Sequence, residues 1–536
     1  MKPVLLYDTT LRDGVQGENI HFTADQKLTV AKKLDEFGIH YIEGGWPGSN
    51  PVDRHFFELA KKTDFTNSKI VAFGSTRKPW ISPDQDENLH SLVSSQAPVI
   101  TIFGKTWNLH VEKVMKITLE ENLSMIRGSL AYLKASGREV IYDAEHFFDG
   151  YKEDPEYAIK TLCAARDGNA DAIVLCDTNG GTMVHEIEEI MHSVNNNFLN
   201  TYISKSEKAH IKIGIHTHND CGLAVANTIA GVRNGAAIVQ GTINGYGERC
   251  GNADLTSIIP ILCCKMNIKC IGLKNMANLK NVSRFVSEIA NTVPLKSRPF
   301  VGQSAFTHKA GSHVNAVRKE PRAYEHIEPE KVGNTRRVLV SDLSGKSNVE
   351  YKAEDFGIKL PENTPDSRKI VLEIKEREEQ GYQYDAADGS LKILMQKLTN
   401  QFEHEFQLES FRVTVEKNKD MPCMAHATVK VSVGGRHEFT AAEGDGPVSA
   451  LDNAIRKALG KFFPDIDSMR LVDFKVRVID GRAGTAAKVR VLIDSRDQDH
   501  VWSTVGVSDD IIEASWQALA DSFQYKLARG HSKFDK

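Results

Sequence analysis

Eight short apolar segments, separated by helical patterns, fill roughly the first 270 residues of this 536-residue chain. Short apolar runs alternating with helices predict a parallel sheet joined by crossover helices. Eight repeats over about 250 residues match a (β/α)8 TIM barrel better than an open doubly wound sheet, which stays as the alternative. No Gly-x-Gly-x-x-Gly follows a strand, as a dinucleotide-binding open sheet would require. The predicted strands are 4–8, 40–44, 69–73, 99–103, 140–144, 172–176, 211–216 and 237–243.

The first helical segment illustrates the local signals. Thr23 and Gln26 have the spacing of a capping box, and Gly38 follows the last apolar position as a stop. These signals predict a helix between Thr23 and Gly38, packed on the sheet through its apolar stripe.

Three domains are predicted: a catalytic barrel over 1–275, helical linker subdomains over 276–400 and a regulatory domain over 401–536. The last contains an apparent repeat with a spacing of 60, in which 427–433 corresponds to 487–493. Each half is predicted to be a βββα module. Gly446 and Gly506 would each precede a helix, where free backbone N–H groups bind small carboxylates. Ordinary capping by Ser449 or Ser508 is an equally good interpretation.

Composition indicates a globular protein and excludes several functions. A formal net charge of −4 gives no reason to expect nucleic-acid binding, and no apolar run has membrane-spanning length. The N-terminal residues lack the pattern of a signal peptide, so we expect a cytoplasmic protein with reduced thiols. The eight cysteines show no zinc-binding spacing. Cys263 and Cys264 lie in an apolar helical run, which predicts two buried thiols.

Polar residues cluster where the predicted strands end. His216 and His218 are two residues apart in a strand, so their side chains point the same way. Asp13 follows the first strand, which neighbours the seventh around a closed barrel of eight and can therefore reach the same ion. Other polar residues at strand ends are Arg12, Glu43, Asp143, Glu145, Asp177, Thr178 and Asn244. Asp8 and Asp143 are predicted to orient Arg12 or backbone groups, and Glu43 to be a supporting or structural residue.

Two imidazoles and one carboxylate suit Mn²⁺, Co²⁺, Fe²⁺ or Zn²⁺. Mg²⁺ also fits if water and substrate oxygens complete an octahedron. The sequence therefore predicts a divalent metal site without deciding which ion fills it.

Three runs resemble, in this order, the family of metal-dependent TIM-barrel aldol enzymes. They are Asp8-Thr-Thr-Leu-Arg-Asp-Gly14, His216-Thr-His-Asn-Asp-Cys-Gly-Leu-Ala224 and Asn244-Gly-Tyr-Gly-Glu-Arg-Cys-Gly-Asn252. That family comprises the 2-isopropylmalate, homocitrate and citramalate synthases and the lyase acting on hydroxymethylglutaryl-CoA. The Gly311-Ser-His313 run and the duplicated C-terminal region resemble the condensing synthases. Ile42-Glu-Gly-Gly-Trp-Pro-Gly-Ser-Asn-Pro51 and Gly381-Tyr-Gln-Tyr-Asp-Ala-Ala387 resemble the long-type citramalate synthases.

The resemblance implies roles for individual residues. It implies that Asp13, His216 and His218 are metal ligands and that Asn252 is a weaker fourth ligand. It implies that Arg12 lies beside the keto group of the substrate, that Glu145 lies near the substrate, and that Thr178 contacts the substrate carboxylate. It also implies that His313 and Tyr324 enter the active site of the neighbouring subunit. It favours Mg²⁺ or Mn²⁺. One departure affects the finer assignments: Ala144-Glu-His-Phe-Phe148 lacks the Glu-Asp pair common in isopropylmalate synthases.

The implied reaction joins acetyl-CoA, as co-substrate, to pyruvate and then hydrolyses the thioester. Glu145 and His313 are the candidates for the base and for water activation. The resemblance also implies a homodimer inhibited by isoleucine. Alternatives are a 2-isopropylmalate or homocitrate synthase using a longer 2-oxo acid, a lyase, or a non-catalytic amino-acid-binding regulator. The clustered Arg12, Asp13, His216 and His218 argue against the regulator.

Overall fold

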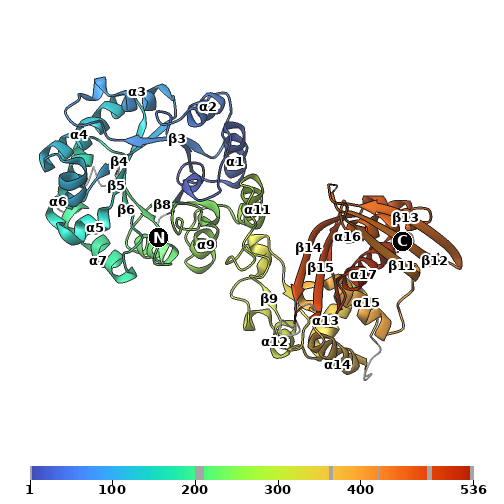
Figure 1. Ribbon diagram of the computed structural model, residues 1–536. Coiled ribbons are helices and arrows are strands. Elements are labelled where there is room, and N and C mark those ends of the chain that lie inside the picture. The colour runs from blue at the N-terminus through green and yellow to red at the C-terminus, as the bar shows by residue number, and fades with distance from the viewer. Residues whose placement is uncertain are drawn as a thin grey trace. The chain divides into compact units, whose positions relative to one another are not determined.

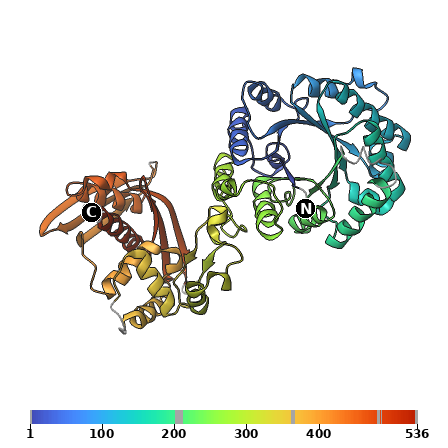
Figure 2. The same cartoon turned by 180° about the vertical axis from the view of Figure 1, so that it is seen from behind.

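The computed structural model describes residues 3–199, 211–360, 366–420, 422–479, 484 and 486–531. The chain divides into two compact units. The first comprises Met1–Phe306 and Ile327–Thr335, and the second comprises Thr307–His326 and Arg336–Lys536 (Figures 1 and 2). No helix in the described part of the chain is both long and apolar enough to cross a bilayer.

The first unit is a closed barrel of eight parallel strands surrounded by helices, as Figure 1 shows. Strand β1 pairs with β2 on one side and with β8 on the other, which closes the sheet. This closure confirms the predicted TIM barrel and excludes the open sheet. The strands are β1 (Leu5–Asp8), β2 (Tyr41–Gly45), β3 (Lys69–Ser75), β4 (Val99–Lys105), β5 (Glu139–Glu145), β6 (Ala172–Asp177), β7 (Lys212–Thr217) and β8 (Ile238–Gly241).

The helices of this unit begin and end at recognisable signals. The Thr23 hydroxyl accepts from the Gln26 amide, the Gln26 side chain accepts in return, and Gly38 ends α1 with φ of 95°. The helices are α1 (Ala24–Phe37), α2 (Pro51–Ala60), α3 (Glu87–Ser94), α4 (Leu119–Ala135), α5 (Phe147–Glu153), α6 (Pro155–Asp167), α7 (Val184–Val194), α8 (Ala224–Arg233), α9 (Leu255–Pro260), α10 (Leu273–Met276) and α11 (Leu279–Ile289).

The barrel interior has an apolar part and a polar part. Tyr7, Val71, Val99, Ile141 and Val174 belong to a buried cluster separate from the larger core between strands and helices. Alternation along each strand separates the interior cluster from the outer core, because successive side chains point into the barrel or towards the helices. The interior also holds buried polar side chains, whose hydrogen bonds support the site described below.

The second unit begins with elements that lie within the predicted linker range 276–400. Its core combines apolar residues of the helices with Val505 and Val507 from the C-terminal domain. The linker elements are β9 (Thr307–His308), α12 (Gly311–Lys319), β10 (Arg337–Val338), α13 (Lys346–Phe356), α14 (Asp366–Glu379) and α15 (Asp388–Leu398).

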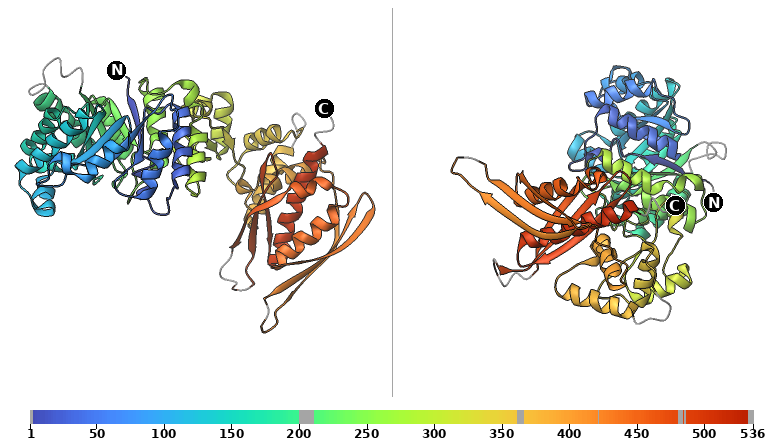
Figure 3. Two further views of the ribbon diagram at one scale, coloured as in Figure 1. Left: turned by 90° about the horizontal axis from the view of Figure 1, so that it is seen from above. Right: turned by 90° about the vertical axis from the view of Figure 1, so that its right-hand side faces the viewer.

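The remainder of this unit consists of two βββα modules, as predicted. Each forms a three-stranded antiparallel sheet with its own helix, and the two helices pack together between the sheets (Figure 3). The first module is β11 (Gln407–Glu416), β12 (Met424–Val433), β13 (Arg436–Gly444) and α16 (Pro447–Leu459). The second is β14 (Arg470–Val478), β15 (Val489–Arg496), β16 (Val501–Ser508) and α17 (Ile511–His531).

The predicted spacing of 60 between the modules is wrong. Val429 pairs with Thr440, and Ile493 pairs with Thr504, so equivalent positions are 64 residues apart. Both threonine hydroxyls donate to a helix carbonyl at 2.7 Å, that of Ala454 in one module and of Ala518 in the other. The two spacings, 60 and 64, differ by four residues. A shift of four residues keeps side chains on the same face of a strand and is close to one turn of a helix, so the sequence pattern matches at both spacings.

The corrected register also removes Gly506 from a helix start. Gly446 caps α16, but Gly506 lies inside β16, and the position equivalent to Gly446 is Asp510. The Asp510 carboxylate accepts from the amides of Ile512 and Glu513. A negative charge therefore already covers the second helix start, which counts against a carboxylate ligand there.

Candidate metal centre and active site

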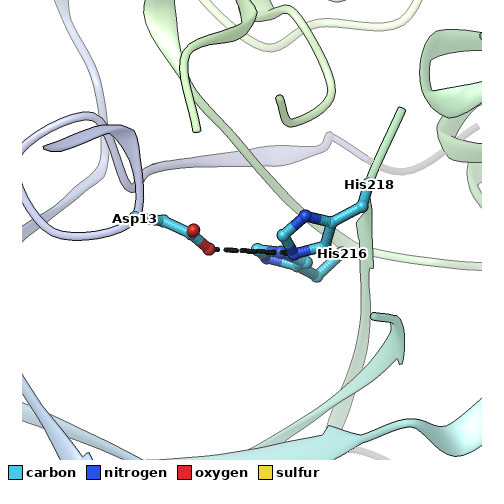
Figure 4. Close-up of side chains that lie close together, drawn as sticks. All are labelled: Asp13, His216 and His218. Atoms are coloured by element: carbon cyan, nitrogen blue, oxygen red, sulfur yellow. Dashed lines mark hydrogen bonds and ion pairs between the residues drawn. The ribbon is translucent and has the colours of Figure 1, made fainter. Parts of the chain in front are cut away.

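Asp13, His216 and His218 meet at the carboxyl ends of β1 and β7, as predicted. The potential ligand atoms of these three buried residues all lie within 4.8 Å of one another (Figure 4). Asp13 Oδ2 is 3.5 Å from His216 Nε2 and 4.0 Å from His218 Nε2, and the two Nε2 atoms are 3.1 Å apart. One carboxylate and two imidazoles aimed at a single point form the protein side of a divalent metal site.

Local backbone structure positions each member. His216 lies one residue before the end of β7, and His218 follows the strand and is bridged to Asn252 in the loop after β8. Asp13 lies in a tight turn whose amides, including its own, donate to the Thr9 carbonyl. The Asp8 carboxylate accepts from the Thr10 amide and hydroxyl and so supports this turn, consistent with its predicted role towards backbone groups.

Electrostatics keep Asp13 and His218 in the forms that bind metal. Burial opposes ionisation of Asp13, but Arg12 and the two imidazoles outweigh it and hold the Asp13 pKa at about 2. Burial and the adjacent His216 lower the pKa of His218 to about 3. Asp13 is therefore charged and His218 neutral across the physiological pH range.

A buried hydrogen-bond chain fixes the orientation of His216. Gln240 Oε1 lies 2.7 Å from His216 Nδ1, and Gln240 Nε2 donates to Asp143 at 3.0 Å. An acceptor at Nδ1 places the proton there and leaves the Nε2 lone pair for a metal. Burial and nearby Glu43 raise the pKa of Asp143, which favours its neutral acid. Asp143 therefore supports the metal group through Gln240.

Glu43 is the residue that holds Arg12. Its carboxylate accepts from Arg12 Nε and, at 2.5 Å, from the Tyr7 hydroxyl. Arg12 also forms an ion pair with Asp13 at 3.2 Å, and its guanidinium carbon lies 3.7 Å from the centre of the Phe73 ring. Burial would lower the Arg12 pKa, but Glu43 and Asp13 raise it, so the side chain is a fixed positive charge beside the metal group.

Three buried polar atoms around the group support a metal ion. Asp13 Oδ1, His218 Nδ1 and Asn252 Oδ1 have no hydrogen-bond partner among the residues that the structure describes. The Asn252 amide nitrogen donates to the Tyr246 carbonyl, which fixes the side chain while its oxygen remains available. Buried oxygens without donors are costly unless a cation or water satisfies them. The residues present therefore fit a divalent ion.

A pocket of about 270 Å³ opens beside this group. Six predicted site residues line it, and the other lining residues include three aromatic side chains and Glu248 and Arg249 from the loop after β8. The lining residues are Arg12, Asp13, Gln16, Trp46, Phe73, Phe103, Asp143, Glu145, Cys176, Thr178, His216, His218, Glu248 and Arg249.

Glu145 and Thr178 lie in this pocket with defined partners. The Glu145 carboxylate forms an ion pair with Lys105 at the end of β4. The Thr178 hydroxyl accepts from the His146 amide at 2.9 Å, which leaves its own proton to donate to a ligand. Arg249 covers this side, because it donates to the Thr178 carbonyl and to Asp220.

His313 and Tyr324 do not belong to the barrel unit. They lie at α12 and just after it, where their rings stack with centroids 4.2 Å apart, and Tyr324 is 49% exposed. The structure therefore brings His313 and Tyr324 together in the second unit, whereas the three potential metal ligands lie in the first unit. Their contribution to an active site stays a prediction.

Three features of the site were not predicted from the sequence. They are Lys105, Gln240 and the aromatic wall of the pocket, which is formed by Trp46, Phe73 and Phe103. Phe73 and Phe103 lie at the ends of predicted strands, and Lys105 follows the fourth, so the strand-end rule could have identified them. Gln240 interrupts an otherwise apolar strand, and its side chain is fully buried. A polar residue buried in a barrel strand is the signal that could have revealed the support for His216.

Three family models match successive parts of the chain. Residues 3–286 match the HMGL-like family, 300–382 the homocitrate synthase post-HMGL domain-like family, and 385–527 the LeuA allosteric (dimerisation) domain. The (R)-citramalate synthase of Geobacter sulfurreducens is 53% identical over 530 residues, which cover 98% of either chain. The chain belongs to the (R)-citramalate synthase family.

Other relatives separate this family from its neighbours. The (R)-citramalate synthase of Aquifex aeolicus is 50% identical over 98% of either chain. A 2-isopropylmalate synthase from Sulfolobus acidocaldarius is 36% identical over 74% of this chain and 97% of its own. The higher, full-length identity to citramalate synthases confirms the resemblance to the long type and disfavours a non-catalytic regulator.

Proposed function

We propose that this enzyme condenses acetyl-CoA with pyruvate and hydrolyses the resulting thioester, giving (R)-citramalate and CoA. The observation that carries the proposal is the buried Asp13, His216 and His218 group beside Arg12 in a small pocket. The full-length similarity to (R)-citramalate synthases supports the same reaction.

Asp13, His216 and His218 would hold Mg²⁺ or Mn²⁺, with the Asn252 oxygen as a weaker fourth ligand. When bound, the ion supplies Lewis-acid polarisation of the keto group. Arg12 donates to the keto oxygen and stabilises its negative charge as the new carbon–carbon bond forms. Thr178, whose hydroxyl proton is free to donate, binds the pyruvate carboxylate. These contacts orient the keto carbon towards the acetyl group.

Glu145 is positioned to move a proton. Its carboxylate lines the pocket, and Lys105 holds it in place through their ion pair. We assign Glu145 and His313 to proton removal from the acetyl methyl group and to activation of the hydrolytic water. In this proposal His313 and Tyr324 complete the neighbouring subunit's site, because they lie outside the barrel unit.

The aromatic wall supports pyruvate as the 2-oxo acid. Phe73 and Phe103 stack with centroids 5.6 Å apart, and Trp46 packs edge-on against both rings. Three rings packed against one another form a rigid wall, which resists displacement by a branched side chain. A longer 2-oxo acid would have to displace them, which disfavours 2-isopropylmalate or homocitrate synthase activity.

The test is CoA-thiol release from acetyl-CoA with pyruvate, 2-oxobutanoate, 2-oxoisovalerate and 2-oxoglutarate. We expect the highest kcat/KM with pyruvate and residual activity with 2-oxobutanoate, since one methylene changes binding by only about 1–3 kcal/mol. A higher kcat/KM with 2-oxoisovalerate would identify an isopropylmalate synthase instead.

We further propose a homodimer inhibited by isoleucine. The match to the LeuA allosteric (dimerisation) domain supports both features. The edge strand β14 also exposes apolar side chains on one face, at Val472, Phe474, Val476 and Val478. Such a face is a liability in a monomer and suits contact with a second copy.

Ultracentrifugation of the Val476→Lys variant tests the dimer. We expect the variant to dissociate at concentrations where the wild-type chain is dimeric. For the effector, CoA release titrated with isoleucine and with leucine should show stronger inhibition by isoleucine. Equal inhibition, or none, would remove isoleucine as the assigned ligand.

A further inference from the structure

Two cysteines at the amino-terminal end of the barrel lie unusually close together. Cys263 Sγ and Cys270 Sγ are 3.1 Å apart. Cys263 belongs to the π-helical turn Ile261–Lys265 that follows α9, and Cys270 lies in the loop between this turn and α10. This loop packs against the start of β1, because the Lys269 carbonyl accepts from the Val4 amide at 3.1 Å. The pair is therefore at the end of the barrel opposite the metal group.

Backbone geometry holds the two thiols together. Asn267 has a φ of 54° and reverses the chain between them. The amides of Met266 and Ile268 donate back to the carbonyls of Ile261 and Leu262, at 3.1 and 2.9 Å. The approach of the two sulfurs is thus built into a hydrogen-bonded turn.

The two thiols differ in access and in acidity. Cys263 and Cys264 are both half-buried, which corrects the expectation of two buried thiols, while Cys270 is 5% exposed. The contact with the Cys270 thiol, with help from the amides of Ile271 and Cys270, lowers the pKa of Cys263. Neighbouring Cys264 has a pKa raised by burial, and its thiol donates to the Met276 sulfur at 3.9 Å. Of these three, Cys263 is the reactive thiolate and Cys270 the nearest thiol to it.

We propose that Cys263 and Cys270 form a reversible disulfide when the enzyme meets a peroxide. The Cys263 thiolate attacks one peroxide oxygen and becomes a sulfenic acid, and hydroxide leaves. The Cys270 thiol then attacks that sulfur, which forms the S–S bond and releases water. In sum, two thiols and one hydrogen peroxide give one disulfide and two waters. A dithiol reverses the change by thiol–disulfide exchange.

Peptide mapping of the full-length enzyme tests the proposal directly. Lys265 and Lys269 lie between the two cysteines, so trypsin places them on separate peptides, 250–265 and 270–274. After hydrogen peroxide treatment and alkylation in denaturant, we expect these peptides to be joined, and a dithiol to separate them. Two fewer of the eight thiols should then react with an alkylating reagent.

Serine variants assign the two steps. Cys264→Ser is the matched control and should keep the cross-link, because Cys264 shares the peptide but faces Met276. Cys263→Ser should lose the cross-link and leave Cys270 unmodified. Cys270→Ser should accumulate a sulfenic acid at Cys263 that a dimedone probe labels. All three should keep wild-type CoA release before oxidation, since the pair lies away from the site, and similar melting temperatures would show that they fold.

Three results would overturn the proposal. The first is a cross-link from Cys264 or Cys250 to Cys270 that persists in Cys263→Ser. The second is conversion of Cys263 to a sulfinic acid in the wild-type enzyme without any joined peptide. The third is oxidation of Cys270 at the wild-type rate in Cys263→Ser.

Discussion

Replacing Gln240 with leucine should weaken metal binding without touching a metal ligand. Gln240 Oε1 lies 2.7 Å from His216 Nδ1 inside the barrel, where water cannot replace it. Leucine has a similar volume but offers no acceptor, so the imidazole would lose the bond that fixes its proton on Nδ1. The same substitution removes the donor to Asp143.

The size of the effect follows from these two bonds. Loss of a buried partner behind a ligating histidine costs about 10–100-fold in metal affinity. That range corresponds to about 1.4–2.7 kcal/mol. Asp143 and His216 would each also be left with an unsatisfied buried group, at about 1–3 kcal/mol of folding stability per group. Gln240→Glu is the comparison variant, because it keeps an acceptor towards His216 and replaces the donor to Asp143 with a carboxylate oxygen to which the neutral Asp143 acid can donate.

Mn²⁺ titration by electron paramagnetic resonance measures the affinity, and urea unfolding measures the stability. We expect Gln240→Leu to bind Mn²⁺ about 10–100-fold more weakly and to regain much of its activity at saturating metal. Gln240→Glu should stay close to wild-type affinity. If Gln240→Leu bound Mn²⁺ within twofold of wild type, Gln240 would not orient His216, and the argument from the hydrogen-bond chain would be refuted.

Three further changes test other parts of the account. Phe103→Ala should raise kcat/KM for 2-oxobutanoate relative to pyruvate by about tenfold; an unchanged ratio would remove the aromatic wall as the source of selectivity. Burial raises the pKa of Asp8 to about 7, above its unfolded value, so its contribution to stability is full below pH 4 and is lost as pH rises through 7. Between pH 5 and pH 8 the free energy of unfolding in urea should fall by about 2–3 kcal/mol in the wild type, and Asp8→Asn should not show this fall; parallel pH profiles of the two proteins would contradict this. Mixing inactive His313→Ala chains with inactive Asp13→Ala chains should restore part of the CoA release, because one active site of each mixed dimer would then have both residues intact. If mixed dimers form but release no CoA, His313 acts in the active site of its own chain.

The barrel was predictable because its signal is local and repeated. Each strand is a short apolar run, and each end of α1 carries a cap that acts within one turn of helix, at Thr23 and Gly38. His216, His218 and Asp13 followed from the same regularity, since alternation and closure of the barrel determine which side chains meet. None of these inferences needed knowledge of side-chain packing.

Packing determines what the sequence could not predict. The predicted spacing of the C-terminal repeat is wrong because small apolar residues recur every four positions. Only the strand pairing fixes the register, in which Thr440 lies opposite Val429 in one module and Thr504 lies opposite Ile493 in the other. The partner of Arg12 was equally hidden, because Glu43 and Asp143 both lie near the carboxyl ends of barrel strands and only the side-chain geometry selects Glu43. Cys263 and Cys270 meet through a reversed turn that no periodic pattern reveals.

The central claim is that Asp13, His216 and His218 hold one divalent ion on which condensation depends. The most direct measurement is the number of Mn²⁺ ions bound per chain in the wild-type enzyme and in His218→Ala, with CoA release followed on the same samples. We predict one tightly bound ion and pyruvate-dependent CoA release in the wild type, and loss of both in a folded His218→Ala. A variant that loses the ion but releases CoA at the wild-type rate, or that keeps the ion at full affinity, would contradict the account.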